Sequence, residues 1–156
     1  MGFCLSGRGG AENSGRTKSF ATILRMQAKD FDKWNDKKKV IHATDRIVLF
    51  HEREIWWSSL GVNIGFEQDG TNDLFERPVL VIKKFNRDVL WVLPLTRSDK
   101  QNRYYVPISV GDKDSMVILS QLRLISAKRL QRYMHKLPTG QFKRIVQLVQ
   151  QFFPKP

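Results

Sequence analysis

The chain has 156 residues, of which 41% are apolar and 27% are charged. This length and composition predict a single domain with a hydrophobic core of ordinary size, and they exclude a chain that is disordered throughout. No apolar run approaches the ~18 residues that a membrane-spanning helix needs, so no membrane partner is expected. The single cysteine, Cys4, excludes an internal disulfide and a cysteine-based zinc site, and it favours a reducing, cytoplasmic compartment.

The net charge of +12 favours a polyanionic partner, nucleic acid above all, and this charge is unevenly distributed. Residues 1–53 hold 11 Lys and Arg against 6 Asp and Glu, and residues 54–125 hold 9 of each. Residues 126–156 hold 7 basic residues and no acidic one. The basic flanks are either solvated helix faces or a nucleic-acid surface, and composition does not decide between them.

Residues 1–20 are rich in glycine and serine, which predicts a disordered segment ahead of a single domain over residues 21–156. Within that domain, a helix is expected over residues 30–43. Its apolar positions are Phe31, Trp34, Val40 and Ile41.

After residue 53 the apolar pattern becomes that of strands. Five strands are expected, with a hairpin turn at 86–88, over residues 54–60, 79–82, 89–93, 104–106 and 116–119. The second and third are apolar on both faces and should be central in a sheet. Short strands at this spacing predict a small β-barrel over residues 53–125.

Two helices are expected within residues 126–153. Ser126 is a good N-cap for the first, over residues 127–136, and a proline separates it from the second. The apolar stripe of the first helix is Leu130, Tyr133, Met134 and Leu137. The expected fold is therefore mainly β with flanking helices (α+β): an N-terminal helix, a small barrel and two C-terminal helices.

Most sequence signatures of catalysis are missing. The chain has no glycine-rich phosphate loop with lysine, no His-Glu-x-x-His, no Gly-x-Ser-x-Gly and no paired aspartates for two metals. The three histidines, His42, His51 and His135, lie outside the strand-rich middle. The sequence therefore predicts no metal, no cofactor and no nuclease that uses two histidines.

Several segments in the middle of the chain follow one another in an order that resembles the MazF/PemK-like toxins of bacterial type II toxin–antitoxin systems. They are EIWW, LGVNIGFEQ, RPVLVI, LPLT and ILSQLR, at residues 54–57, 60–68, 77–82, 93–96 and 118–123. The fold of that family is an SH3-like or plasmid-toxin barrel with flanking helices. Residues 71–76 depart from the compact family pattern, because they lengthen a loop and add two acids.

The resemblance implies a homodimeric, metal-independent endoribonuclease that cuts single-stranded RNA at short sequences. In the family, an Arg at the start of the second strand and a Ser or Thr at the end of the third form the active centre. Arg77 and Thr96 match these two positions, and Glu67 matches a third candidate. Residues near these positions are the expected RNA contacts: Trp56, Trp57, Gln68, Arg97, Lys100, Gln121 and Arg123.

These residue types suit the cleavage of RNA by its own 2′-hydroxyl. A guanidinium offers paired donors to phosphate oxygens and stays charged, so Arg77 is expected to stabilise the phosphorane rather than act as a base. Thr96 can donate to a non-bridging oxygen or orient the nucleophile. Glu67 can take the proton or hold Arg77 in place, and the sequence does not decide which.

Each of these three assignments has a purely structural alternative. The arginine can form a surface ion pair with Glu54 or Glu76, and the threonine can belong to a turn with Ser98 and Asp99. The glutamate can be an exposed loop charge without further function.

The two adjacent tryptophans should differ in environment, because neighbouring residues of a strand face opposite sides. One of Trp56 and Trp57 should pack in the core, and the other can stack an unpaired base or face a dimer partner. The sequence does not say which ring does which.

The expected partners are single-stranded RNA, a second copy of the chain, and a cognate antitoxin that is acidic and disordered until bound. Operator DNA, together with the antitoxin, is a further expected partner. The same fold leaves two other functions open: a non-catalytic DNA- or RNA-binding protein and a gyrase-directed toxin.

Overall fold

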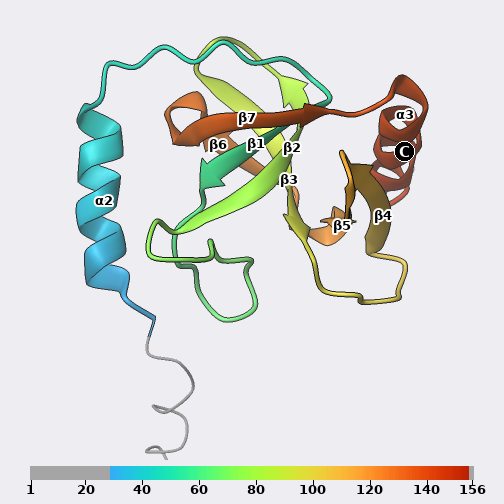
Figure 1. Ribbon diagram of the computed structural model, residues 1–156, viewed down its shortest axis with the longest axis horizontal. Coiled ribbons are helices and arrows are strands. Elements are labelled where there is room, and N and C mark those ends of the chain that lie inside the picture. Colours follow the sequence, from blue (N-terminus) through green and yellow to red (C-terminus); the bar gives the residue numbers. More distant parts are fainter. Residues whose placement is uncertain (1–28, 155–156) are drawn as a thin grey trace, which may run out of the picture.

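Residues 29–154, which the computed structural model describes, form seven antiparallel strands and two helices (Figure 1). The expected disordered segment 1–20 and the start of the domain at residue 21 lie outside these residues. The elements are α2 (Phe31–Ala43), β1 (Glu54–Ser59), β2 (Glu76–Lys84), β3 (Val89–Thr96), β4 (Tyr105–Val110), β5 (Lys113–Ile118), β6 (Arg123–Ser126), β7 (Leu130–Lys136) and α3 (Thr139–Gln150). The expected class, mainly β with flanking helices, is confirmed. No helix of this part of the chain is long and apolar enough to span a bilayer.

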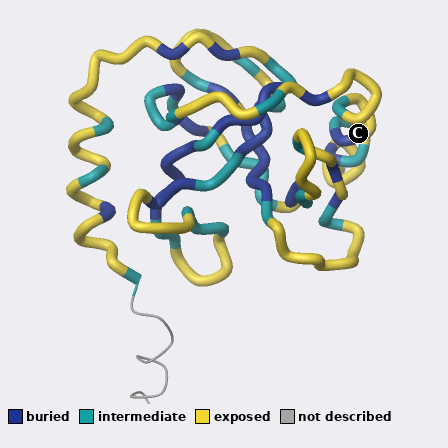
Figure 2. The backbone as a smooth tube through the Cα atoms, in the orientation of Figure 1, coloured by how far each residue is buried: buried dark blue, intermediate teal, exposed yellow. Residues whose placement is uncertain are grey.

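The strands pair in the order β4-β5-β3-β2-β1-β7, and β6 also pairs with β3. Val79 and Val81 of β2 pack into one core cluster, whereas Leu80 between them packs into a second, because neighbours on a strand face opposite sides. The first cluster is completed by β6, Val48 and Phe50, and the second by β4, β5 and α3. Figure 2 shows the buried chain concentrated in the central strands. The expected central position of β2 and β3 is confirmed.

Helix α2 forms where the sequence predicts it, but its buried face is narrower than expected. Asp30 caps the helix by accepting the N–H of Lys33 at 2.9 Å. Of the four apolar residues expected on its inner face, only Trp34 is buried, and both Phe31 and Val40 are exposed. The helix is therefore held mainly by one aromatic ring.

The prediction of a helix over residues 127–136 is wrong. Residues 130–136 form strand β7, paired with β1, and Ser126 caps only a short 3₁₀ turn. Leu130 is buried as expected, but Tyr133 and Met134 are exposed. The edge of β1 offers backbone hydrogen bonds to a whole strand, and this tertiary pairing outweighs the local helical spacing. The second expected helix is present as α3.

Glu54 is a buried carboxylate at the start of β1. Its Oε2 accepts the indole N–H of Trp56 and the backbone N–H of His51, both at 2.9 Å, and its Oε1 lies 3.1 Å from Nδ1 of the same histidine. Desolvation raises the pKa of Glu54, but the hydrogen bonds from Trp56 and His51 together lower it by more than desolvation raises it. The pKa of Glu54 therefore lies below its ordinary value.

This environment predicts a pH dependence of stability. A carboxylate whose pKa is lowered by folding stabilises the protein above its unfolded pKa, and the contribution is lost as the pH falls through the folded pKa. The contribution of Glu54 should therefore be full near neutral pH and decline below about pH 4.5. We expect Glu54→Gln to be less stable at neutral pH and to lose less stability on acidification, as measured by urea unfolding. Parallel pH profiles for the two proteins would contradict this expectation.

Candidate functional site

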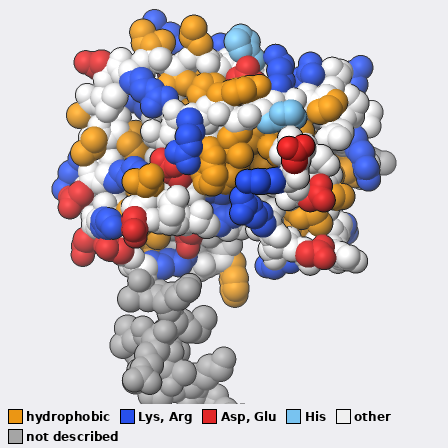
Figure 3. Space-filling model, viewed as in Figure 1, with side chains coloured by type: hydrophobic (Ala, Val, Ile, Leu, Met, Phe, Trp, Pro, Cys, Tyr) orange, Lys and Arg blue, Asp and Glu red, His pale blue; other side chains and the backbone are white. Residues whose placement is uncertain are grey.

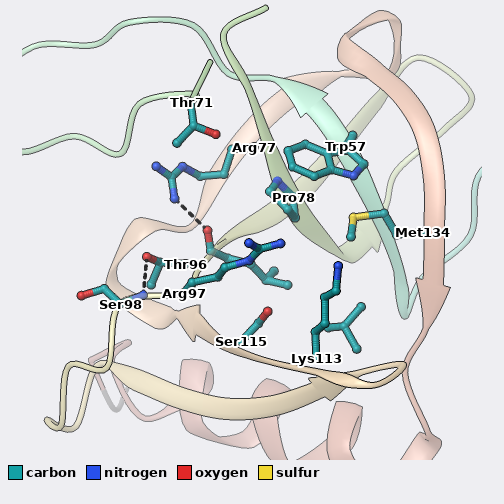
Figure 4. A pocket seen from close by; sticks show the side chains of 12 residues that line it. Trp57, Thr71, Arg77, Pro78, Thr96, Arg97, Ser98, Lys113, Ser115 and Met134 are labelled. Carbon is teal, nitrogen blue, oxygen red and sulfur yellow. Dashed lines mark hydrogen bonds between the residues drawn. The ribbon is translucent and has the colours of Figure 1, made fainter.

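A cavity of about 420 Å³ lies where the start of β2 and the end of β3 face β5 and β7 (Figure 4). Its cations are Arg77, Arg97 and Lys113. Four hydroxyl groups line it as well, on Thr71, Thr96, Ser98 and Ser115, and no described lining residue is a carboxylate. A cavity with three cations, several hydroxyls and no acid suits an anionic ligand that offers oxygen acceptors.

The antiparallel register brings the two main candidate residues together. Val79 of β2 pairs with Pro94 of β3, and continuing this register by two residues places Arg77 opposite Thr96. Both residues line the same cavity. Arg77 and Thr96 therefore lie in one cleft because of the register between the adjacent strands β2 and β3.

Arg77 is held by main-chain oxygens. Its Nε donates to the carbonyl of Asp69, and its Nη1 donates to the carbonyl of Leu95 at 3.0 Å. These bonds use two of the five N–H donors of the guanidinium and leave three for a ligand. The alternative surface ion pair is not formed, because Glu54 lies in the core and Glu76 binds Arg132 at 2.8 Å.

The electrostatic environment of Arg77 favours an anion. Burial lowers the pKa of its guanidinium, the carboxylate of Asp69 raises this pKa, and the charge of Arg123 lowers it. An arginine nevertheless stays charged in a protein. A half-buried cation that has main-chain carbonyls rather than a carboxylate as its hydrogen-bond partners gains from an incoming anionic oxygen.

Thr96 takes part in a turn and also lines the Arg77 cavity. Its Oγ1 accepts the backbone N–H of Ser98 at 3.1 Å, so the threonine does take part in a turn. This bond uses a lone pair of the oxygen and leaves the hydroxyl proton free to be donated. The turn therefore orients the hydroxyl at the cavity.

The structure also distinguishes the two tryptophans. Trp57 lines the cavity beside Pro78 and Met134 (Figure 4). The guanidinium of Arg132 lies 4.7 Å from the ring centre of Trp57. Trp56 packs in the core instead, where its indole N–H is bound by a buried carboxylate. Trp57 is thus the aromatic group of the cavity, and Trp56 is not available there. In the view of Figure 3, a group of apolar side chains near the centre lies between Lys and Arg side chains.

Glu67 lies apart from the Arg77 cavity. Together with Gln121 and Arg123 it lines a second cavity of about 520 Å³. Oε1 of Gln121 accepts the N–H of Gln68 at 3.1 Å and a guanidinium N–H of Arg123 at 3.2 Å. Burial lowers the pKa of Arg123, and the charges of Glu67 and Asp69 raise it. Three of the expected site residues, Glu67, Gln121 and Arg123, therefore line this second cavity, and Gln68 is hydrogen-bonded to one of them.

The two remaining candidate residues, Arg97 and Lys100, lie in different places. Arg97 lines the Arg77 cavity, whereas Lys100 lines neither cavity and has its Nζ 5.7 Å from the ring centre of Tyr105. Lys113 and Ser115 of β5 were missed. Both lie ahead of the strand expected over residues 116–119, and only the strand order, which no local pattern gives, brings β5 beside β3.

The chain is similar to known proteins in both sequence pattern and fold. The family model described as "PemK-like, MazF-like toxin of type II toxin-antitoxin system" matches residues 51–153. The structure of "Mycobacterium tuberculosis toxin MazF-mt6" has a TM-score of 0.50 and 18% identity, and the match covers 64% of this chain and 94% of that one. A search of curated proteins found no match.

A second structure is described as "Endoribonuclease in complex with its cognate antitoxin from Mycobacterial species". It has a TM-score of 0.52 and 11% identity, and the match covers 69% of this chain and 100% of that one. At these identities the two structures show a shared fold alone. The family match, however, spans more than half of the chain and includes the whole sheet and both cavities. The chain therefore belongs to the PemK-like, MazF-like toxins of type II toxin–antitoxin systems.

Proposed function

We propose that this toxin is an endoribonuclease that cuts single-stranded RNA, with the RNA 2′-hydroxyl as nucleophile and without a metal. The observation that carries the proposal is the cavity that Arg77 and Thr96 both line, which holds three cations and, among the described residues, no carboxylate. Membership of the family and the likeness to a structure described as an endoribonuclease support it.

In the proposed reaction the 2′-oxygen bonds to phosphorus and gives up its proton to water, while the bond between phosphorus and the 5′-oxygen breaks. The products are a 2′,3′-cyclic phosphate and a 5′-hydroxyl, whose oxygen takes up a proton from water. Negative charge grows on the non-bridging oxygens in the pentavalent transition state. In this proposal the three remaining N–H donors of Arg77 and the hydroxyl of Thr96 stabilise that charge.

The other candidate residues take binding roles in this proposal. Trp57 stacks an unpaired base, a contact worth about 1–3 kcal/mol per base. Arg97 and Lys113 bind phosphates that flank the scissile one, because both line the cavity of Arg77. Glu67 tunes Arg123 in the second cavity rather than taking the proton, because it does not line the Arg77 cavity.

Protein and DNA partners form a further part of the proposal. An acidic antitoxin, disordered until bound, complements a chain whose net charge is +12, and a structure of the same fold is described as a complex with a cognate antitoxin. We extend the proposal to a homodimer and, together with the antitoxin, to operator DNA.

The proposal is tested with a labelled single-stranded RNA of mixed sequence in EDTA. We expect defined cuts with cyclic phosphate ends, and no cut where the nucleotide before the scissile bond carries a 2′-deoxy sugar. Thr96→Ala should slow cleavage, whereas Thr96→Ser, which keeps the hydroxyl, should cleave nearly as fast as the wild type.

Three outcomes would contradict the proposal. Cleavage of the 2′-deoxy substrate would exclude the 2′-hydroxyl as nucleophile, and cleavage only after a divalent metal is added would exclude the metal-free reaction. Intact RNA together with inhibited gyrase supercoiling, or with DNA binding that falls steeply with salt, would favour one of the two alternative functions instead.

A further inference from the structure

A lysine that precedes the family-matched residues is bound inside the domain. The ammonium of Lys29 donates to the carbonyl of Asn63 at 2.6 Å and to that of Gly65 at 3.3 Å, and it lies 2.8 Å from Oδ2 of Asp69. These three acceptors match the three N–H donors of an ammonium group. Both side chains of the ion pair are only about a quarter exposed, at 24% and 27%. Lys29 is therefore bound by the loop of residues 61–70 in a defined position.

Asp69 connects this lysine to the candidate catalytic arginine. Its carboxylate contacts Lys29 through Oδ2 and accepts the backbone N–H of Asn63 at 2.6 Å through Oδ1. Its main-chain carbonyl accepts the Nε–H of Arg77. The position of that carbonyl therefore depends on a residue whose side chain is fixed by Lys29.

Helix α2 fixes the backbone next to Lys29. Asp30, the next residue, caps the helix, and the ring of Trp34 is buried against Gly61 and lies 5.7 Å from the ring of Phe75. Gly61 has a φ of +85°, and a Cβ at this position would overlap the indole of Trp34. Figure 1 shows α2 alongside the sheet, with its N-terminal end toward the loop that follows β1. The helix thus holds both Lys29 and one end of the 61–70 loop.

The loop is also held from the opposite side. The side chain of Gln121 donates to the carbonyl of Phe66 at 3.3 Å and accepts the N–H of Gln68 at 3.1 Å. Gln121 belongs to the family-matched residues, whereas Lys29 does not. The loop is therefore held by one residue within the family-matched segment 51–153 and by one residue that precedes this segment.

We propose that Lys29 is a positioning residue, which holds the Asp69 carbonyl so that Arg77 presents its free N–H donors to the scissile phosphate. This role rests on the proposed ribonuclease function. The ammonium group of Lys29 uses its three N–H donors to bind residues of the loop, so none is left to bind substrate. Its loss should lower the rate of the chemical step and leave RNA binding nearly unchanged.

Single-turnover RNA cleavage by the full chain tests the kinetic part. We expect Lys29→Met to lower the single-turnover rate constant by roughly tenfold, since a small misplacement of a catalytic group costs rate. The protein concentration that gives half of the maximal rate should change little. Lys29→Arg should recover most of the loss. Lys39→Met is the matched control, because Lys39 lies on helix α2, its side chain is 70% exposed, and its salt bridge among the described residues is with Asp36. Lys29→Met should also cause no further loss in an Arg77→Ala background, whereas independent losses would contradict the proposal.

A second readout does not need ribonuclease activity. In a ¹⁵N-arginine spectrum, the Nε–H of Arg77 should exchange with water at least about tenfold faster in Lys29→Met, because the accepting carbonyl is no longer fixed. The Nε–H of Arg53, which donates to the carbonyl of Leu137 at 3.0 Å, is the internal control and should not change. Unchanged exchange at Arg77 would overturn the proposal. If the wild type cuts no RNA but exchange at Arg77 responds, the proposed function fails while the support of Arg77 by Lys29 stands.

Discussion

Replacing Arg77 with alanine is expected to lower the single-turnover rate of RNA cleavage by about 100- to 1000-fold, the usual cost of losing one preorganised donor to a developing oxyanion. The guanidinium is already fixed by two main-chain carbonyls, so it needs little rearrangement when charge develops on the phosphate. Arg77→Lys should recover only a small part of the rate, because an ammonium keeps the charge but not the paired planar donors.

The matched control for this prediction is Arg87→Ala. Arg87 lies in the turn between β2 and β3, its side chain is 81% exposed, and its ion pair is with the adjacent Asp88. Its removal should leave the rate within about twofold of the wild type, since exposed ion pairs contribute little. Equal rates for Arg77→Ala and the wild type would refute the assignment of Arg77.

Replacing Trp34 with alanine is expected to release helix α2 from the sheet. The ring is 5% exposed, and truncation of a buried tryptophan costs about 3–5 kcal/mol. A free helix of 13 residues is marginal in water, so the backbone amides of α2 should lose their protection from hydrogen exchange while those of the central strands keep theirs.

Phe31→Ala is the control on the same helix. Phe31 is 49% exposed, so its removal should change the stability by less than about 0.5 kcal/mol. If the amides of α2 were equally protected in Trp34→Ala and in Phe31→Ala, then the helix would not be anchored by the indole.

Local sequence patterns predicted most of the elements because those elements carry their own signals. The turn at 86–88 carries an asparagine whose side chain accepts the N–H groups of Asp88 and Val89, and α2 begins at a capping aspartate. Strand β7 has no such signal. Leu130 and Met134 fall at helical spacing, and the pairing that makes them part of a strand is with β1, far away in the sequence.

The candidate site shows the same division between local and long-range information. Arg77 and Thr96 could be picked out from the motifs around them, and the register of two consecutive strands brings them together. The position of Glu67 depends on how a ten-residue loop folds between Lys29 and Gln121. Neither contact leaves a local trace in the sequence, so the sequence alone could not separate Glu67 from the Arg77 cavity.

The anchoring of Trp34 also defines how short the chain can be made. A fragment that begins at residue 51, where the family match starts, would leave the ring of Phe75 facing water on the side that α2 covers. It would also leave Asp69 without its ammonium partner. Such a fragment should expose an apolar aromatic surface and be prone to self-association. A minimal soluble fragment for crystallisation or screening should therefore begin no later than Lys29.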